Sequence, residues 1–306
     1  MIKIKVPATT ANLGPGFDCF GMALKLYLFL EIEEIKQGLI IQSQGEGASQ
    51  FEENENNLIW KAFKLVLDKF NKGKDVKGLK IKTLNQIPVT RGLGSSASAI
   101  IGGIVAATGL YNLKLSYQEI LEIALSLEGH MDNIIPALLG GFTLAYSTEK
   151  EQVKWVKIKI PDDLRIVVAI PDFFLSTEKM RSVLPGKIPL ADAIFNLSRS
   201  ALLVKALQDS DWTLLAEAME DKLHQPFRTS YIPGIKEMFS QVRNTGHAGI
   251  ALSGSGPTVV SLTKRGSEKI IGQIMEDTFL KAGINCRVLV LEADLEGTKT
   301  VYSEEN

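Results

Sequence analysis

The chain has 306 residues, of which 45% are hydrophobic and 23% charged, and its formal net charge is −1. This length allows one large hydrophobic core or, more in line with usual domain sizes, two. A charge this close to zero argues against a nucleic acid or an anionic membrane as partner, because proteins that bind them usually carry a basic excess. The one basic run, at residues 69–82, is interrupted by acidic residues and glycines and favours a solvated surface.

Cysteine content and the N-terminal residues bear on location. Cys19 and Cys286 are the only cysteines, and Met-Ile-Lys-Ile-Lys-Val at the start contains no apolar core of signal-peptide length. We therefore expect a reducing, cytoplasmic environment. The longest nearly apolar stretch, residues 97–110, is shorter than the roughly 20 residues that span a membrane. With its three glycines it predicts a buried helix packed closely against a neighbour.

The first half of the chain mixes predicted strands and helices. Alternating or apolar runs predict strands at residues 2–6, 24–33, 79–84 and 140–146. Helices are predicted at residues 58–70, 97–110 and 116–128, the last beginning with a capping box formed by Ser116 and Glu119. Residues 7–21 are too rich in Gly, Pro and small polar residues to predict a regular element, and residues 129–136 break the helical pattern.

The charged residues 149–159 predict an edge strand or a linker, and a new buried strand begins at residues 166–170. We therefore expect an N-terminal domain at residues 1–160 and a C-terminal domain at residues 161–306. The mixture of elements beyond the boundary fits a second α+β domain. Its helices are predicted at 189–208, 211–223, 233–243 and 267–281, and its further strands at 248–253, 257–262 and 286–292.

Residues 88–98, Pro-Val-Thr-Arg-Gly-Leu-Gly-Ser-Ser-Ala-Ser, join a predicted strand to a predicted helix. Gly92 and Gly94 allow positive φ angles and let an anion approach the backbone. The first N–H groups of the helix are unpaired and lie at the positive end of its dipole, which is typical of a phosphate site. An ordinary helix start capped by serine has the same pattern. The loop lacks the Lys of a P-loop and the glycine spacing of a Rossmann turn.

Two other segments, residues 7–21 and 253–257, are also rich in glycine and hydroxyl residues. The second, Ser-Gly-Ser-Gly-Pro, lies between two predicted strands and by itself is consistent with a plain hairpin turn. Three such segments in one chain indicate a shared ligand.

The chain resembles the GHMP small-molecule kinases over essentially its whole length. Residues 88–98 are similar to the ATP loop of that superfamily, residues 7–18 to a first motif and residues 252–258 to a third. The resemblance narrows to the homoserine kinases through the first motif together with three others, at residues 128–133, 176–181 and 224–228.

This resemblance implies a two-domain α+β fold, with an N-terminal domain like ribosomal S5 domain 2, a ferredoxin-like C-terminal domain and the active site between them. The implied reaction transfers the γ-phosphoryl group of ATP to the hydroxyl of L-homoserine for threonine synthesis. A homodimer is usual in the family.

The resemblance also implies the site residues. The ATP loop would comprise Pro88, Arg91, Gly92, Leu93, Gly94, Ser95, Ser96, Ala97 and Ser98. The homoserine pocket would be lined by Asn12, Asp18, His130, Asn133, Arg181 and Arg228. The chemistry agrees, because an Arg fork binds a carboxylate in bidentate fashion and Asp18 would take the ammonium group. Taken singly, each residue also fits an ordinary structural role. The two arginines could form surface ion pairs, His130 could lie at the end of a helix, and Asp18 could form a turn.

Magnesium is implied by ATP chemistry, because the ion bridges phosphate oxygens during transfer. By resemblance its ligands would be Ser96 and Glu122, although Glu122 falls on the polar face of its predicted helix with Gln118 and Ser126. Adenine is expected against apolar residues that follow the asparagine cluster at residues 54–57.

Asp132 is the candidate general base, because relatives such as mevalonate kinase have an Asp at that position. Homoserine kinases are commonly thought to work without a strong base, so this role stays open.

Two other functions also stay open. A related kinase acting on mevalonate, a sugar or a similar alcohol is the nearer one, and two arginines argue against a sugar but not against mevalonate. The other is a catalytically silent relative that binds a ligand or RNA, against which the near-neutral charge and the intact glycine loop both argue.

Overall fold

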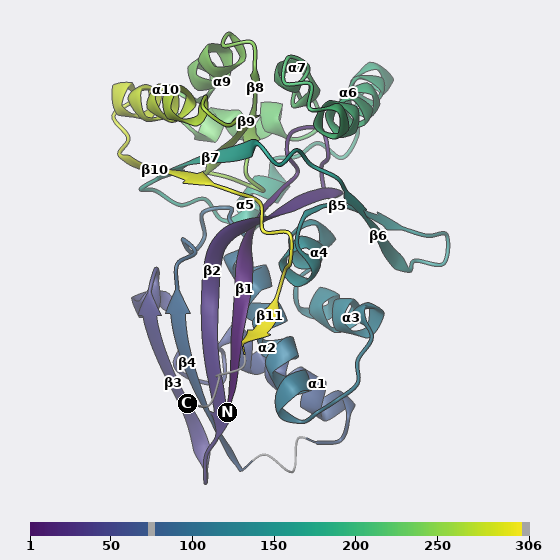
Figure 1. Ribbon diagram of the computed structural model, residues 1–306, viewed down its shortest axis with the longest axis vertical. Helices are drawn as coiled ribbons and strands as arrows, with labels where there is room; N and C mark the ends of the chain where they lie inside the picture. The colour runs from purple at the N-terminus through teal and green to yellow at the C-terminus, as the bar shows by residue number, and fades with distance from the viewer. Residues whose placement is uncertain (73–76, 302–306) are drawn as a thin grey trace.

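The computed structural model describes residues 1–72 and 77–301, and within them the chain forms two β-sheets, each covered by helices. The first sheet, in the lower part of Figure 1, has the order β11-β1-β2-β4-β3, and β5 and β6 extend it from β2. Its pairs are antiparallel except for β3 with β4. Its strands are β1 (Ile2–Ala11), β2 (Phe20–Glu34), β3 (Gly38–Gly45), β4 (Gly78–Asn85), β5 (Phe142–Ser147), β6 (Val153–Ile158) and β11 (Lys299–Val301).

Helices cover one face of this sheet (Figure 1). They bury the apolar side chains that alternate along β1, where Ile2, Ile4 and Val6 point into the core between half-exposed lysines. The helices are α1 (Leu58–Lys69), α2 (Ser95–Leu110), α3 (Tyr117–Leu127) and α4 (Met131–Leu139). A short 3₁₀ turn at Ala48–Gln50 precedes α1.

Helix α2 is buried over most of its surface, since ten of its 16 residues are buried. A Cβ at Gly103 would collide with the carbonyl oxygen of Ile59 in α1. The two helices therefore approach each other more closely than a larger side chain permits. This confirms the buried helix with a close neighbour that the sequence predicts for residues 97–110.

The second sheet is antiparallel, with the order β10-β7-β9-β8. Every residue of β7 is buried, because Val167 and Ala169 face one hydrophobic cluster and Ile166 and Val168 face the other. A continuous apolar run is what a strand covered on both faces requires. The strands are β7 (Leu164–Pro171), β8 (Ala248–Leu252), β9 (Val259–Lys264) and β10 (Cys286–Leu291).

The helices of this second part gather at the top of Figure 1, apart from α5, which lies near the junction of the two sheets. They are α5 (Thr177–Ser182), α6 (Leu190–Asp209), α7 (Leu215–Ala218), α8 (Gln225–Arg228), α9 (Ile235–Arg243) and α10 (Glu268–Lys281), with a 3₁₀ turn at Thr229–Tyr231.

Most predicted elements lie where the sequence places them, but residues 7–21 and 129–136 do not. Strand β1 continues through Ala11, with a register shift at Pro7 and Ala8 that lets a residue without an N–H group stay in the strand. Helix α4 occupies the predicted break despite containing Pro136. Its apolar side chains are buried in the first core, so packing outweighs the cost of an internal proline.

The helix predicted at residues 211–223 shortens to the four residues of α7. Beyond it the side chain of Asp221 accepts the backbone N–H groups of Leu223, His224 and Gln225, which starts α8 instead. The short elements β3, β11, α5 and α8 have no counterpart in the sequence prediction.

The chain passes between the sheets near the predicted boundary, because β6 ends at Ile158 and β7 begins at Leu164. Strand β11 returns to the first sheet and pairs with β1 (Figure 1). The division into residues 1–160 and 161–306 stays a prediction.

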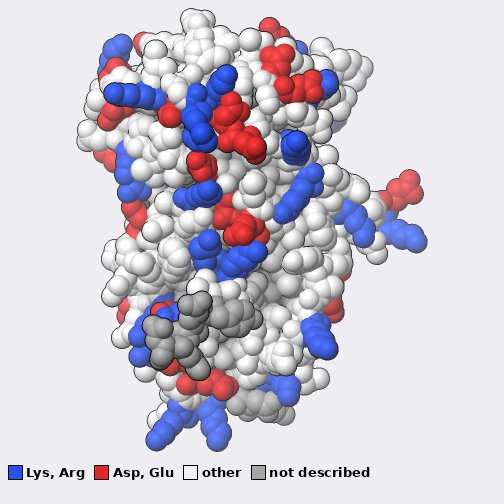
Figure 2. Space-filling model, in the orientation of Figure 1, with Lys and Arg blue, Asp and Glu red and all other residues white. Residues whose placement is uncertain are grey.

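The described surface carries both charge signs. Basic and acidic side chains intermingle on the face shown in Figure 2. The ion pairs of the described residues include that of Lys25 with Glu292. Of the basic run at residues 69–82, positions 73–76 lie outside the described residues. No helix in the described chain has the length and apolar character needed to cross a membrane.

Candidate active site

A cavity of about 370 Å³ lies between the two parts of the fold. The three glycine-rich segments meet there, since its wall includes Asn12, Phe17 and Asp18 from the first, residues 89–97 from the second, and Gly254 and Ser255 from the third. These segments are far apart in sequence, so the fold has assembled one site from loops of both sheets.

The glycine loop has the geometry that the sequence predicts for a phosphate site. Gly92 and Gly94 have φ angles of 81° and 68°, and a Cβ at Gly94 would collide with the hydroxyl of Thr9. Helix α2 begins at the next residue, and no side chain caps its N-terminus. Its first N–H groups and the positive end of its dipole are therefore available to an anion in the cavity.

Not every residue expected in the ATP loop reaches the cavity. Residues 91–97 line it, whereas Pro88 is buried elsewhere. Ser98 is also buried, and its hydroxyl donates hydrogen bonds to the carbonyl oxygens of Pro7 and Gly94 at 2.8 and 3.0 Å. Ser98 therefore joins α2 to β1 rather than facing a ligand.

All six residues expected to hold homoserine line the same cavity, namely Asn12, Asp18, His130, Asn133, Arg181 and Arg228. Arg181 Nη2 donates to Asp18 Oδ1 at 2.6 Å and lies 2.9 Å from His130 Nδ1. The buried Nε of Arg181 has no hydrogen-bond partner in the described part of the chain.

Asn12 holds the first loop in place. Its Oδ1 accepts the backbone N–H of Asp18 at 2.9 Å, and its Nδ2 donates to the carbonyl oxygen of Gly254 at 2.9 Å. Asn12 also has a φ of 69°, which Asn tolerates better than most residues. Both of its polar groups are engaged within the protein, so its role in the structure is to position Asp18.

Arg228 is a buried cation without an anionic partner. Its side chain is only 2% exposed, and among the described residues no carboxylate lies within ion-pair distance. Its Nε donates to the carbonyl oxygen of Met180 at 3.0 Å and its Nη1 to that of Gly254 at 3.2 Å. Burial lowers the pKa of Arg228 to about 10, so it remains charged near neutrality. A buried unpaired charge is costly, and an anionic ligand in the cavity would offset that cost.

Asp132 and Asn133 lie at the start of α4, facing the cavity. Asp132 is 3% exposed, and burial together with the nearby charge of Asp18 raises its pKa to about 7. The hydroxyl of Thr9 donates to Asn133 Oδ1 at 2.8 Å, and Asn133 Nδ2 donates to Asp132 Oδ1 at 3.2 Å. These bonds fix the orientation of the Asn133 amide.

The structure does not bring Glu122 to Ser96. Glu122 is exposed on the outer face of α3, where it accepts a hydrogen bond from Gln118, and it does not line the cavity. Glu128 takes the expected place, because Ser96 Oγ donates to its Oε2 at 2.5 Å and both residues line the cavity. The helical spacing carries Ile120 and Ala124 inward and Glu122 outward, whereas Glu128 follows the end of α3.

The Ser96–Glu128 pair is chemically suited to magnesium. Mg²⁺ prefers oxygen ligands and is usually held by one or two carboxylates together with substrate phosphates. The described residues contain no cluster of three or more His, Cys, Asp or Glu side chains able to hold a metal alone. Ser96 and Glu128 therefore fit a magnesium site whose remaining ligands are phosphate oxygens of a substrate.

Apolar side chains also line the cavity. They are Phe51, Leu58, Ile59 and Val89, and the first three flank the asparagine cluster at residues 54–57 in the sequence. Asn57 caps α1 by accepting the backbone N–H of Ile59 at 2.9 Å. This is where the sequence predicts an apolar surface for adenine.

Comparison with known proteins identifies the family. The family models for the GHMP kinases N terminal domain and C terminal match residues 57–141 and 203–279. The homoserine kinase of Petrotoga mobilis is 44% identical over 304 residues, which cover 99% of this chain and 98% of that protein. The homoserine kinase of Aquifex aeolicus is also 44% identical over 304 residues, which cover 99% of this chain and 100% of that protein. The chain belongs to the homoserine kinase family.

Solved structures of other proteins have the same fold as this chain. A homoserine kinase from Cytophaga hutchinsonii has a TM-score of 0.86 at 28% identity and covers 98% of this chain and 97% of its own. The mevalonate kinase of L. major in complex with R-mevalonate has a TM-score of 0.71 at 19% identity, covering 96% of each chain, and shows the fold alone. The two sheets with their helices are the two-domain GHMP kinase fold, as the resemblance implies.

Three residues of the site are not singled out by the sequence. Thr9 orients Asn133, Glu128 lies beside Ser96, and His224 contacts Arg228 with its Nδ1 3.1 Å from Nη1. Glu128 and His224 belong to motifs that carry the family resemblance, so the motif marked them without indicating their roles.

Proposed function

We propose that the protein is a homoserine kinase, which transfers the γ-phosphoryl group of ATP to the side-chain hydroxyl of L-homoserine. The products are O-phospho-L-homoserine and ADP, and the reaction serves threonine biosynthesis. Arg228 carries this proposal, because a buried guanidinium without an anionic partner faces the same cavity as an uncapped helix N-terminus. One cavity thus offers separate sites for a carboxylate and for phosphates.

L-Homoserine carries a carboxylate, an ammonium group and a hydroxyl, and the cavity offers a group for each. Arg181 and Arg228 suit the carboxylate, since guanidinium groups bind carboxylates through paired N–H donors. Asp18 suits the ammonium group. Asp18 is paired with Arg181 at 2.6 Å, so substrate binding would exchange this ion pair for two pairs with the amino acid.

ATP fits the remaining space, with adenine against Phe51, Leu58, Ile59 and Val89 and the phosphates at the glycine loop. Ser96 and Glu128 would hold Mg²⁺, which would neutralise charge on the phosphates. The N-terminus of α2 orients the phosphates, and Asn133, which lines the cavity, lies next to Gly94 of this loop. Phosphoryl transfer depends mainly on such positioning and charge stabilisation.

Asp132 is the candidate acceptor for the hydroxyl proton. A general base works best with a pKa near the working pH, and burial brings the pKa of Asp132 to about 7. As the homoserine oxygen bonds to phosphorus and the bond to ADP breaks, the hydroxyl proton would pass to the Asp132 carboxylate.

A coupled ADP-release assay with L-homoserine, mevalonate and galactose tests the substrate. We expect kcat/KM to be highest for L-homoserine by at least about a hundredfold, because buried polar groups left unpaired by the wrong substrate penalise it. No turnover of L-homoserine would refute the proposal, and preferred turnover of mevalonate would support the related kinase instead. ATP binding without turnover of any alcohol would support a silent relative.

The proposal includes a homodimer that works in the cytoplasm. Both cysteines are free thiols, which suits a reducing compartment. Light scattering of the purified protein should give about twice the 33.5 kDa mass of one chain, and a mass equal to one chain at all concentrations would contradict the dimer.

A further inference from the structure

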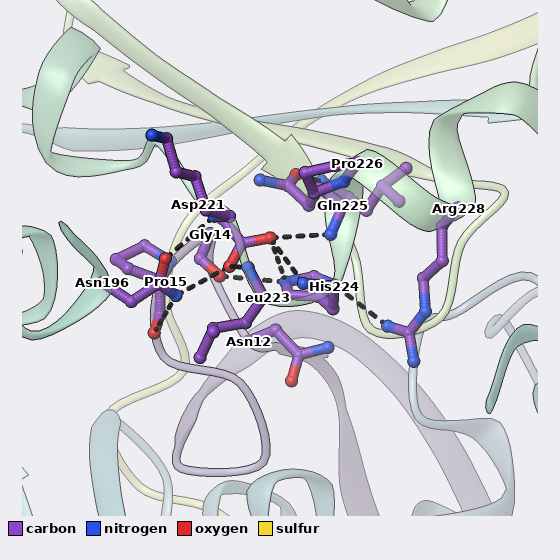
Figure 3. A network of polar contacts seen from close by, with 12 residues as sticks. Asn12, Gly14, Pro15, Asn196, Asp221, Leu223, His224, Gln225, Pro226 and Arg228 are labelled. Carbon is purple, nitrogen blue, oxygen red and sulfur yellow. Dashed lines mark hydrogen bonds and ion pairs between the residues drawn. The ribbon is translucent and has the colours of Figure 1, made fainter. Parts of the chain in front are cut away.

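Behind the two arginines lies a buried polar network that the proposed reaction does not use. It joins the loop at residues 12–18 to helix α8 through Asp221, His224 and Asn196 (Figure 3). We propose that His224, as one fixed neutral tautomer, is a positioning residue for the substrate carboxylate site that holds Arg228 and the first loop in register. This inference rests on the proposed function and deepens it.

The polar partners of His224 define its tautomer. Its Nε2 lies 2.9 Å from the carbonyl oxygen of Gly14 and 3.5 Å from Asp221 Oδ2, which can both only accept, so Nε2 carries the proton and donates it. Its Nδ1 lies 3.1 Å from Arg228 Nη1, which can only donate, so Nδ1 is unprotonated and accepts. Burial lowers the pKa of His224, which keeps the ring neutral. A neutral ring is needed, because a protonated Nδ1 would oppose the guanidinium.

Asp221 fixes the backbone that carries His224. Its buried carboxylate accepts the N–H groups of Leu223, His224 and Gln225 at 2.9, 3.0 and 2.7 Å. It also accepts Asn196 Nδ2 at 2.8 Å. With every contact engaged, the start of α8 has little freedom to shift.

The network reaches the first loop at two further points. Asn196 Nδ2 and Ser200 Oγ both donate to the carbonyl oxygen of Pro15, at 3.3 and 3.0 Å. The ring of Phe17 stacks on His224, with centroids 5.2 Å apart and an angle of 23° between the planes.

Phe17 links His224 to both arginines. The guanidinium carbons of Arg228 and Arg181 lie 5.4 and 5.6 Å from the centroid of the Phe17 ring. His224 thus acts on Arg228 by a direct hydrogen bond and on both guanidinium groups through the ring between them. Displacing the His224 ring would release the groups that bind the substrate carboxylate, while the ATP loop has no contact with it.

Two substitutions separate the two hydrogen bonds. His224→Gln places a donor where Nε2 lies and removes the acceptor for Arg228, whereas His224→Asn places an acceptor where Nδ1 lies and removes the donor to Gly14. We expect His224→Gln to raise the homoserine KM about tenfold or more, as for loss of a hydrogen bond to a charged group. The KM for ATP should stay within about twofold, and His224→Asn should raise the homoserine KM less than His224→Gln does.

A double-mutant cycle with Arg228→Lys separates positioning from general structural support. If His224 acts through Arg228, adding His224→Gln to Arg228→Lys raises the homoserine KM by less than about twofold. If His224→Gln does not fold, the cycle is run with His224→Leu, which also removes the acceptor for Arg228, and the same absence of a further rise is expected. Full multiplication of the two effects would overturn the inference.

His247→Gln is the matched control, because His247 lies outside the network and the cavity, and its KM values should match the wild type. An unchanged homoserine KM in His224→Gln would also overturn the inference while leaving the proposed function intact. Absence of homoserine turnover in the wild type would instead refute the proposed function, so the two failures are distinguishable.

Discussion

Asp132 shows how the fold changes the chemistry of a single residue. It is an ordinary aspartate in the sequence, but burial and the nearby Asp18 bring its pKa to about 7. If it accepts the substrate proton, Asp132→Asn should lower kcat by about a hundredfold or more at saturating substrates. In the wild type kcat should rise with pH through about 7, and the variant should lack this rise. A loss below about tenfold would exclude the base role.

The same pKa shift predicts a stability effect of known sign. The folded-state pKa of about 7 lies above the unfolded value of about 3.9, so folding disfavours the ionised form. The cost is absent below pH 4, grows between pH 4 and 7, and is complete above pH 7. Thermal melts should therefore show Asp132→Asn more stable than the wild type at pH 8, with a smaller difference at pH 5. A variant that melts below the wild type at pH 8 would contradict this.

The magnesium ligands give a prediction with a built-in control. Glu128, which directly follows α3, lies beside Ser96, whereas Glu122 within α3 is exposed. Glu128→Gln should raise the Mg²⁺ concentration for half-maximal activity about tenfold or more, because Mg²⁺ binds through a small number of carboxylates. Glu122→Gln should leave it within about twofold. Initial rates measured against Mg²⁺ concentration test this. A larger rise for Glu122→Gln than for Glu128→Gln would restore Glu122 as the ligand, as the sequence predicts.

For single residues, the sequence predicts which residues line the site better than it predicts which residues contact one another. The motifs named all six residues that line the homoserine part of the cavity. They did not separate Glu122 from Glu128, because the turn of the chain after α3 decides which of the two faces Ser96. Nor did they reveal the pKa of Asp132 or the tautomer of His224, which arise from burial by distant segments.

Among the elements, the contact of α1 with α2 matters most for the site. Helix α1 carries Leu58 and Ile59, which line the cavity, and α2 begins at the glycine loop. Gly103 permits this contact. Gly103→Ala should destabilise the protein by about 1–3 kcal/mol, the range for overpacking, since collision with the Ile59 carbonyl outweighs the better helix propensity of alanine.

The matched control for Gly103 is Gly186→Ala. Gly186 is exposed and has open space where a Cβ would stand, so this substitution should leave the denaturation midpoint nearly unchanged. Equal midpoints for both alanine variants in urea would show that the two helices do not depend on the glycine.

Elements with strong local patterns could be predicted, and those decided by packing could not. The alternation along β2 and the capping box of α3 are local signals, and both elements form as expected. Residues 7–21 and 129–136 read as irregular because of their Gly, Pro and polar content. Pairing with β2 makes residues 7–11 part of a strand, and burial in the first core makes residues 131–139 a helix.

For the whole molecule, the decisive feature is that the site is built from both sheets. Ser253 in the second part donates to Thr10 Oγ1 at 2.9 Å, and Asn12 donates to Gly254 O at 2.9 Å. These partners are more than 240 positions apart in the chain. No local pattern contains such pairings, so the placement of the site between the two domains came from the family resemblance, and the return of β11 to β1 came from the structure itself.

The central claim is that one cavity binds the phosphates of ATP and the carboxylate of L-homoserine, so that the γ-phosphoryl group passes from ATP to the homoserine hydroxyl. Phosphorus NMR of a reaction with ATP and L-homoserine tests it most directly. We expect O-phospho-L-homoserine and ADP to accumulate in equal amounts, and Arg228→Lys to need a much higher homoserine concentration for the same rate. Formation of ADP and free phosphate without a phosphate ester of homoserine would contradict the account.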